Sequence, residues 1–401
     1  MIARIHPAPL RGSIAAIPSK SEAHRLLICA ALADVPTKLI MRGSSQDIDS
    51  TIRCLTALGA GIEVHDDHLL VQPISHVPAS CEMDVGESGT TLRFMLCIAA
   101  ALGVDARFVM HGRLGSRPMQ ALEDALQSGG CKTDRSRENL LHIRGQLRPG
   151  TFALPGNVSS QYISGLLMAL ALLHGPSVLN IVGNIESADY IQMTLRAMQS
   201  FGICPKQTGF GFEFDGKQAY ISPRTLAVDG DWSNAAFWLC ADALPGCAVE
   251  VTGLCSDSAQ GDRRIADIVR QLPPTIDASP IPDLIPTIVA MYAALEKPLH
   301  VENAARLRLK ESDRLHTVCR TITALGGSCS EGSDSLLLEG GHPLSGGRVD
   351  AAGDHRIAMM AAVAAIACRN TVEITGAEAV AKSYPDFWRG YAALGGRVEP
   401  I

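Results

Sequence analysis

Seven basic residues lie at or near the expected ends of helices or within apolar segments, where a positive charge needs a partner. They are Lys20, Arg25, Arg93, Lys310, Arg314, Arg356 and Lys382. A basic side chain is unfavourable in the first turn of a helix, because the free backbone amides there already carry a partial positive charge. Lys20, Arg356 and Lys382 lie at or near such starts, and an anionic ligand would explain all three. A single arginine on a helix is more often solvated or salt-bridged, so the recurrence is what indicates an anion site.

The overall charge makes a local cluster of this kind necessary. The chain carries a net charge of -6, which disfavours nonspecific binding to nucleic acid. Residues 1–12 contain no apolar run typical of a secretory signal, and the longest apolar runs, 163–173 and 357–368, are shorter than the roughly 18 residues of a membrane span. We therefore expect a cytoplasmic protein with no nucleic-acid or membrane partner.

The basic residues belong to a pattern of helices that repeats six times. One helix in each repeat is amphipathic, is expected to begin at a serine and ends near a glycine, as capping preferences favour. The six serines are Ser45, Ser116, Ser187, Ser258, Ser312 and Ser383. Four of the five intervals are 71 residues, and the interval after Ser258 is 54. Such regular spacing predicts a chain built from six related units.

A second helix in each repeat is apolar almost all round, so we expect it to be buried while the amphipathic helix covers the outside. These helices begin near Ser19, Glu87, Val158, Asp231, Ile281 and Asp354. Most amphipathic helices are followed by short alternating stretches typical of β-hairpins, but the fourth runs into Pro273 and Pro274 and should lack its hairpin. A chain of 401 residues should form two domains, hence three repeats each.

The twelve cysteines contain no C-x-x-C pair, and a large chain needs no disulfide framework. We expect most of them to act as small core hydrophobes, and we expect no zinc site.

Short motifs around the basic residues carry a family resemblance. They are Pro18-Ser19-Lys20-Ser21 with Arg25, the run from Glu87 to Arg93, Arg117-Pro118, the run from Val158 to Gln161, Pro282-Asp283, the run from Leu309 to Leu315, Asp354-His355-Arg356, and the run from Lys382 to Asp386. Together they resemble the 5-enolpyruvylshikimate-3-phosphate synthase family over the whole chain and in the expected order. The resemblance implies an α/β fold of two inside-out α/β barrels, each with three βαβαββ repeats, that close on the substrates. One domain would comprise residues 1–18 and 230–401, and the other residues 19–229.

The resemblance also implies a reaction. An enzyme of this family transfers the enolpyruvyl group of phosphoenolpyruvate to the 5-hydroxyl of shikimate 3-phosphate and releases inorganic phosphate, by addition followed by elimination. Asp283 would take the proton from the 5-hydroxyl, Glu311 would protonate the methylene carbon, and Lys20 would complete the catalytic set. No metal or organic cofactor is implied, and the chain is expected to act as a monomer.

The binding residues follow from the same resemblance. Those implied for shikimate 3-phosphate are Lys20, Ser21, Arg25, Ser159, Ser160, Gln161, Ser187, Tyr190, Asp283 and Lys310. Those implied for phosphoenolpyruvate are Lys20, Gly89, Arg93, Arg117, Gln161, Arg314, Arg356 and Lys382. Two residues depart from the family pattern, since Glu87 stands where many members have Asn and Arg306 where an Asn often contacts the shikimate hydroxyls. Gly89 is the small residue associated with inhibition by glyphosate, which we expect here.

Other interpretations of these residues remain. Asp283 could be a helix cap, and Glu311 a surface carboxylate paired with Arg314. The sister enzyme UDP-N-acetylglucosamine enolpyruvyl transferase shares the fold, but typically has Lys-Asn at Lys20-Ser21 and a reactive cysteine in the loop that here spans 112–117. A noncatalytic phosphometabolite-binding protein on the same scaffold would keep the basic cluster and lose Asp283 or Glu311.

Overall fold

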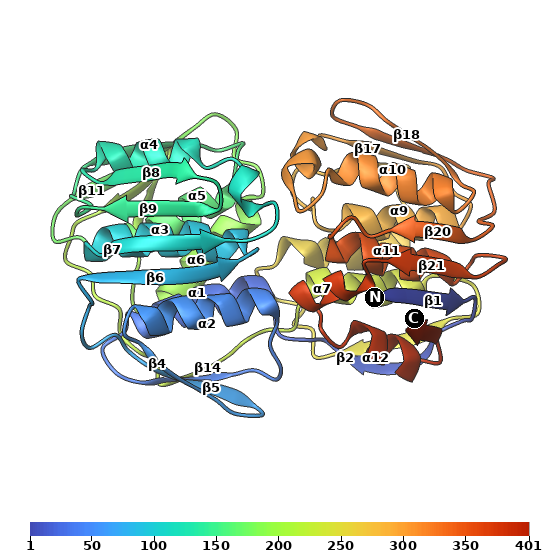
Figure 1. Ribbon diagram of the computed structural model, residues 1–401, viewed down its shortest axis with the longest axis horizontal. Helices are drawn as coiled ribbons and strands as arrows, with labels where there is room; N and C mark the ends of the chain where they lie inside the picture. Colours follow the sequence, from blue (N-terminus) through green and yellow to red (C-terminus); the bar gives the residue numbers. More distant parts are fainter. Residues whose placement is uncertain (401) are drawn as a thin grey trace. The chain divides into compact units, whose positions relative to one another are not determined.

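The computed structural model describes residues 1–400 and divides into two compact units. The central unit is Pro18–Val228, and the terminal unit combines Met1–Ile17 with the described residues from Asp229 on. Each unit has its own hydrophobic core. Figure 1 shows strands and helices in both.

The central unit contains three four-stranded sheets with the same strand order. They are β14 (Thr225–Ala227), β3 (Thr37–Ile40), β5 (His68–Gln72) and β4 (Gly61–Val64); β6 (Ser80–Gly86), β7 (Asp105–Met110), β9 (Leu140–Arg144) and β8 (Lys132–Arg137); and β10 (Thr151–Pro155), β11 (Ser177–Val182), β13 (Gly211–Phe214) and β12 (Lys206–Thr208). In each sheet the first two strands are parallel and the last three form antiparallel pairs. This is the arrangement expected of a βαβαββ repeat.

The terminal unit repeats this arrangement twice in full and once in part. Its sheets are β16 (Thr275–Asp277), β17 (Leu299–Glu302), β19 (Leu336–Glu339) and β18 (Ser328–Glu331); β20 (Gly347–Asp350), β21 (Val372–Thr375), β1 (Ile2–His6) and β22 (Arg397–Pro400); and β15 (Ala248–Thr252) with β2 (Arg11–Ala15). The two-stranded sheet confirms that the fourth repeat lacks its hairpin. The last repeat takes β1 from the start of the chain, next to β21 in Figure 1.

Six interior helices are buried almost all round, as predicted from their apolar sequences. They are α1 (Lys20–Ala31), α3 (Gly89–Leu102), α5 (Ser160–Leu170), α7 (Trp232–Asp242), α9 (Ile285–Ala294) and α11 (His355–Ala365). Five of them begin with a side chain that accepts a hydrogen bond from a backbone amide of the first turn, given by Ser19, Ser88, Ser159, Asp231 and Asp354. These caps fix where five of the six interior helices start.

The amphipathic helices are α2 (Gln46–Ala57), α4 (Gln120–Ser128), α6 (Ala188–Ser200), α8 (Ile265–Gln271), α10 (Arg314–Ala324) and α12 (Phe387–Ala393). Four short 3₁₀ helices, η1 (Leu114–Ser116), η2 (Gly261–Arg264), η3 (Ala305–Leu309) and η4 (Ala377–Lys382), precede four of them. The amphipathic helices stand in the predicted order, but their predicted first residues need correction.

Only Ser45 and Ser187 occupy the N-cap positions predicted for them. The predicted starts at Ser116, Ser258, Ser312 and Ser383 are wrong, because those helices begin two to seven residues later. At Ser116 the cause is Pro118, which excludes helical backbone at Arg117, so α4 starts only at Gln120. The 71-residue spacing therefore marks the repeat and not the exact start of a helix.

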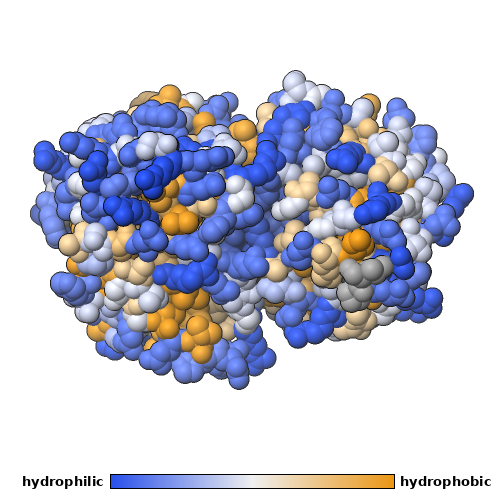
Figure 2. Space-filling model, viewed as in Figure 1, coloured by the Kyte–Doolittle hydropathy of each residue, from blue (hydrophilic) through white to orange (hydrophobic). Residues whose placement is uncertain are grey.

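All twelve cysteines are free thiols, and seven are buried, which confirms that most act as core hydrophobes. The face in Figure 2 is mostly hydrophilic, with hydrophobic residues in small separate groups. Within residues 1–400, no helix is both long enough and apolar enough to cross a membrane.

Candidate active site

The interior helices of the central unit bring their first turns together. Lys20, the first residue of α1, donates from Nζ to Oδ2 of Asp47 at 3.0 Å. Asp47 lies in the first turn of α2, and its backbone oxygen accepts from Oγ1 of Thr91 in α3 at 3.4 Å. The unfavourable charge of Lys20 is thus partly offset by a buried carboxylate, which sequence reasoning missed.

A guanidinium cluster surrounds the start of α3. Nη1 of Arg93 donates to Oε1 of Gln161 at 2.5 Å, and Nε2 of Gln161 donates to Oγ1 of Thr90 at 2.7 Å. A Cβ added at Gly89 would lie 2.6 Å from Nη1 of Arg93 and 2.9 Å from Nη1 of Arg117. The backbone of Gly89 therefore comes close to two guanidinium groups because it carries no side chain. We call Lys20, Asp47, Gly89, Arg93, Arg117 and Gln161 the central cluster.

Arg25 joins α1 to α6 deep inside the central unit. Its Nη1 donates to the backbone oxygen of Ser21 at 2.6 Å, and its Nη2 to that of Tyr190 at 3.0 Å. Its Nε donates to Oγ1 of Thr194 at 2.7 Å. Arg25 is only 1% exposed, so it holds Ser21 and Tyr190 close together while most of its donors bind protein oxygens.

The three serines predicted to bind a phosphate belong to two helix starts of the same unit. Ser159 caps α5, Ser160 is the first residue of that helix, and Ser187 precedes α6. Ser187 has φ 55°, a left-handed conformation that is unfavourable for a serine, and its side chain makes no capping hydrogen bond. Strain of this kind is common at ligand sites.

The terminal unit gathers three basic and three acidic side chains. Oδ1 of Asp283 accepts from Nη1 of Arg314 at 2.7 Å and from Nζ of Lys310 at 3.2 Å. Nη2 of Arg314 donates to Oε2 of Glu311 at 2.6 Å, and its Nε to Oδ2 of Asp354 at 2.8 Å. The side chain of Arg314 is 1% exposed, so one buried cation joins three carboxylates.

Arg356 completes this group from the first turn of α11. Its Nη1 donates to the backbone oxygen of Asp283 at 2.8 Å, and its Nη2 to Oγ of Ser233 in α7 at 2.7 Å. The first turns of α7, α10 and α11 therefore meet around Asp283, which precedes α9. We call Asp283, Lys310, Glu311, Arg314, Asp354 and Arg356 the terminal cluster.

Burial and neighbouring charges shift several pKa values in the terminal cluster. Burial alone would raise the pKa of Asp283, but Lys310, Arg356 and Arg314 hold it well below its usual range. Burial also lowers the pKa of Lys310 from 10.5 to about 8, although Asp283 opposes that shift. Burial disfavours the charge of Arg314, yet Asp354, Glu311 and Asp283 raise its pKa above the usual value. Asp283 is therefore ionised at neutral pH, and Lys310 loses its proton more readily than an ordinary lysine.

The structure decides against both simple interpretations of the two carboxylates. Asp283 is not a helix cap, because α9 begins at Ile285 and no side chain caps it. Glu311 does pair with Arg314, as that alternative stated, but its side chain is only 14% exposed and is not a surface group. Both belong to a buried charge network.

Other sequence-predicted residues need individual comment. Lys382 is buried and ends η4, and α12 begins only at Phe387, so the helix start predicted next to Lys382 lies further along the chain. Glu87 packs over Gly112, where an added Cβ would lie 2.1 Å from its Oε1. Arg306 lies in η3, and its charge is among those that lower the pKa of Lys310.

Sequence reasoning missed Asp47 and Asp354 as members of the site, because a carboxylate at the start of a helix is usually a cap or a dipole partner. The signal that could have found them is a buried basic residue in the same turn, which requires a counter-charge. Within the described part of the chain, no three His, Cys, Asp or Glu side chains lie where they could hold a metal ion.

Comparisons with solved structures identify the class of proteins that shares this fold. The chain matches a solved EPSP synthase from Acinetobacter baumannii over 100% of both chains, with a TM-score of 0.82 and 22% identity. It matches the enolpyruvyl transferase NikO from Streptomyces tendae over 99% of this chain and 98% of the other, with a TM-score of 0.76 and 17% identity. The fold is therefore that of the enolpyruvyl transferases.

Sequence comparison places the chain within that class. The model of the EPSP synthase (3-phosphoshikimate 1-carboxyvinyltransferase) family matches residues 5–390. Proteins named 3-phosphoshikimate 1-carboxyvinyltransferase are 36% identical in Clostridium kluyveri and 37% in Clostridium acetobutylicum, each over 98% of this chain and 97% of the relative. The chain belongs to the EPSP synthase family. This finding favours that family over UDP-N-acetylglucosamine enolpyruvyl transferase and over a noncatalytic binding protein.

Proposed function

We propose that the residues of the central cluster and those of the terminal cluster carry out the reaction of this family. The chain transfers the enolpyruvyl group of phosphoenolpyruvate to the 5-hydroxyl of shikimate 3-phosphate, a step in the biosynthesis of chorismate and the aromatic amino acids. The observation that supports these roles most strongly is the joining of Asp283 and Glu311 by one buried arginine, Arg314. The two proton-transferring groups are thereby held in a fixed relation.

The central cluster is suited to the phosphate of phosphoenolpyruvate. Arg93, Arg117 and Lys20 supply positive charge, Gln161 supplies a side-chain amide, and Gly89 supplies a backbone approach that no larger residue permits. Planar guanidinium groups bind phosphate through paired hydrogen bonds, while a lysine acts as a point charge. Lys20 also stabilises the charge that develops on the phosphate as it leaves. Lys382 contributes a further cation to this phosphate.

A second group of residues is proposed to bind shikimate 3-phosphate. Ser159, Ser160 and Ser187 bind the 3-phosphate at the starts of α5 and α6, where helix amides favour an anion. Ser21 and Arg25 bind the carboxylate. Five further residues complete the set, Lys20, Gln161, Tyr190, Asp283 and Lys310.

The terminal cluster carries the chemistry. Asp283 takes the proton of the 5-hydroxyl, the freed oxygen attacks C2 of phosphoenolpyruvate, and Glu311 protonates C3 to give a tetrahedral intermediate. Elimination then returns a proton from C3 to Glu311 and expels inorganic phosphate, which leaves with the proton that Asp283 took from the hydroxyl. Positioned acid and base groups contribute roughly 10² to 10⁴ to the rate.

Substrate binding would also change the pKa of Asp283, the proposed base. In the free enzyme, Lys310, Arg356 and Arg314 keep the pKa of Asp283 low, which makes it a weak base. The carboxylate of phosphoenolpyruvate, bound by Arg314 and Arg356, would offset part of that positive charge. The pKa of Asp283 then rises, so Asp283 becomes a stronger base only when the second substrate is present.

All these residues belong to one chain, so no second copy is needed to complete the set, and we propose a cytoplasmic monomer. The test of the function is phosphate release with both substrates present. Release should require shikimate 3-phosphate together with phosphoenolpyruvate, and should not occur when UDP-N-acetylglucosamine is the acceptor. Equal release with either acceptor, or none with shikimate 3-phosphate, would contradict the assignment.

A further inference from the structure

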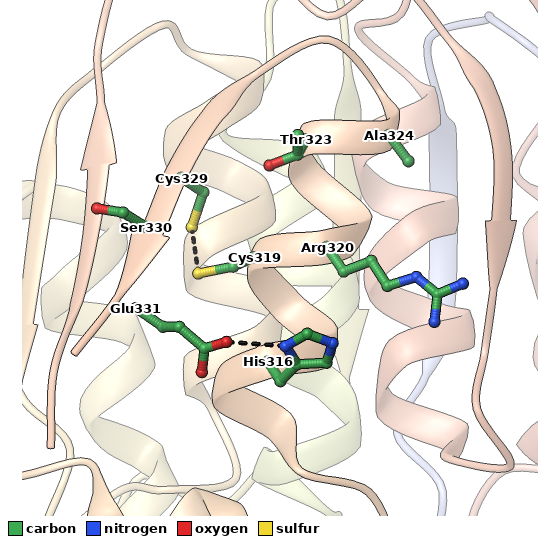
Figure 3. A pocket seen from close by; sticks show the side chains of 8 residues that line it. All are labelled: His316, Cys319, Arg320, Thr323, Ala324, Cys329, Ser330 and Glu331. Atoms are coloured by element: carbon green, nitrogen blue, oxygen red, sulfur yellow. Dashed lines mark hydrogen bonds and ion pairs between the residues drawn. The ribbon is translucent and has the colours of Figure 1, made fainter. Parts of the chain in front are cut away.

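A pair of cysteines lies where α10 meets β18, apart from the residues proposed for the reaction. Sγ of Cys319 in α10 lies 2.8 Å from Sγ of Cys329 in β18. Figure 3 shows the two sulfur atoms pointing at each other from the helix and the strand. Elsewhere in residues 1–400, no two cysteine sulfurs are in hydrogen-bonding contact. The twelve cysteines therefore include one pair whose arrangement core packing does not require.

The two thiols are already close to the geometry of a covalent bond. A disulfide needs a sulfur separation of roughly 2.0 Å, so the sulfurs must approach by about 0.8 Å. Cys319 and Cys329 are ten residues apart in a continuous, well-packed segment that turns at Gly326 and Gly327. The two sulfur atoms therefore need to move only a short distance for the bond to form.

A pocket borders both cysteines. Its volume is about 490 Å³, and its lining includes Cys319, Cys329, His316 and Glu331. Small-molecule sites usually measure roughly 300 to 1,000 Å³. Figure 3 shows His316 and Glu331 beside the sulfur pair, joined by a hydrogen bond of 2.8 Å. Cys329 is half-buried, whereas Cys319 is only 6% exposed, so Cys329 is the more accessible of the two.

We propose that Cys319 and Cys329 form a thiol–disulfide exchange site, which takes a low-molecular-weight disulfide and closes to an intramolecular disulfide. In the first step the Cys329 thiolate attacks one sulfur of the small disulfide, which forms a mixed disulfide and releases one thiol. In the second step the Cys319 thiolate attacks Sγ of Cys329 and expels the second thiol. The cysteines lose two protons and two electrons, and the small disulfide takes them up as two thiols.

The rate of the first step is limited by the protonation of the thiol. The contact with Cys319 and burial both raise the pKa of the Cys329 thiol. Little thiolate is then present at neutral pH, so the first step is slow. The site is suited to slow and sustained oxidation.

The disulfide would tie the middle of α10 to the edge strand β18. It would close a short loop and so restrict the unfolded chain, which stabilises the terminal unit against unfolding. The start of α10 already has its own link to β18, because Arg308 donates to Asp313 at 2.8 Å and pairs with Glu331 at 2.9 Å. The bond adds a covalent link to the same two elements.

The test uses the full-length chain incubated with glutathione disulfide, followed by tryptic mapping. Arg320 lies between the two cysteines, so trypsin separates them in the reduced chain and leaves them joined in the oxidised one. We expect a joined peptide pair in the parent chain and a lasting glutathione adduct on Cys329 in Cys319→Ser. In Cys329→Ser, Cys319 should stay a free thiol.

Exposed single cysteines provide the control. Cys204 and Cys255 should form only mixed disulfides, and Cys204→Ser should leave the joined peptides unchanged. The oxidised parent should also unfold several degrees above the reduced parent, a shift that is absent in Cys319→Ser. A lasting glutathione adduct on Cys329 of the parent, or unmodified Cys319 and Cys329 while Cys204 reacts, would overturn the proposal.

Discussion

The central and terminal clusters both contain buried basic side chains, but they balance that charge differently. In the central cluster, Arg93 donates to the neutral oxygens of Gln161 and Pro118, and Lys20 pairs with one carboxylate, Asp47. In the terminal cluster, three cations face three carboxylates, so the formal charges of its six members cancel. A group with excess positive charge suits phosphate binding, and a compensated group keeps carboxylates available for proton transfer.

This difference assigns phosphate binding to the central cluster and proton transfer to the terminal cluster, and mutations can test that assignment. Changes in the central cluster should mainly alter the affinity for phosphoenolpyruvate. Changes in the terminal cluster should alter turnover and, where they break the charge balance, stability.

The largest expected effect is on turnover. Glu311→Gln and Asp283→Asn each remove a proton-transferring oxygen while keeping the size of the side chain. Phosphate release should fall by roughly 10²- to 10⁴-fold, with binding of shikimate 3-phosphate nearly unchanged by calorimetry. Glu250→Gln, on the exposed side of β15, is the matched control and should retain full activity. A loss of binding equal to the loss of turnover would show that these residues hold substrate instead.

The next effect is on stability. Arg314→Met leaves Asp283, Glu311 and Asp354 without their shared cation, and breaking a buried ion pair in this way costs about 3 to 5 kcal/mol. Urea denaturation should show this loss, whereas Arg320→Met on the exposed face of the same helix should change stability little. Equal stability of the two variants would mean that the network around Arg314 is not balanced as described.

A smaller effect is expected on affinity in the central cluster. Gly89→Ala places a Cβ 2.6 Å from Arg93 and 2.9 Å from Arg117, so both guanidinium groups must move. The KM for phosphoenolpyruvate should rise about tenfold, equivalent to about 1.4 kcal/mol, with a small change in kcat. Gly150→Ala, where an added Cβ meets nothing within 4 Å, is the control.

Glyphosate at millimolar concentration should inhibit the parent, and turnover that glyphosate does not inhibit would contradict that expectation.

The smallest effect is a pH dependence that belongs to the terminal cluster. Because burial lowers the pKa of Lys310 to about 8, kcat/KM should fall as pH rises through that value and the side chain loses its charge. Between about pH 8 and 10.5 the unfolded chain binds more protons than the folded one, so the contribution of Lys310 to stability rises with pH. In Lys310→Arg the alkaline limb should move above pH 10, and an unmoved limb would assign it to another group.

Much of the fold could be predicted because the same pattern of apolar and polar residues occurs in six repeats. The apolar helices, the hairpins and the missing fourth hairpin followed from periodicity and from Pro273-Pro274, which depend on local sequence. The start of α4 could not be read from a serine, because Pro118 controls the backbone before it. Local signals fix which element forms more reliably than where it begins.

The candidate site was predictable in its basic residues and less so in their partners. A lysine in a first turn, such as Lys20, conflicts with the helix dipole and so stands out in the sequence. The negative charges of Asp47 and Asp354 are favoured by that dipole, so neither residue stands out in the sequence. Their role appears only when the fold brings Asp47 to Lys20 and Asp354 to Arg314. The pairing of Cys319 with Cys329 could not be predicted either, because it too depends on which elements the fold brings together.

The most direct test of proton transfer in the terminal cluster is deuterium exchange into the methylene group of phosphoenolpyruvate. The exchange is followed by NMR in D₂O with shikimate 3-phosphate present, for the parent and for Glu311→Gln. Reversible protonation of C3 by Glu311 predicts exchange in the parent and almost none in Glu311→Gln, which should still bind both substrates. Exchange at the parental rate in Glu311→Gln would show that another group protonates the carbon.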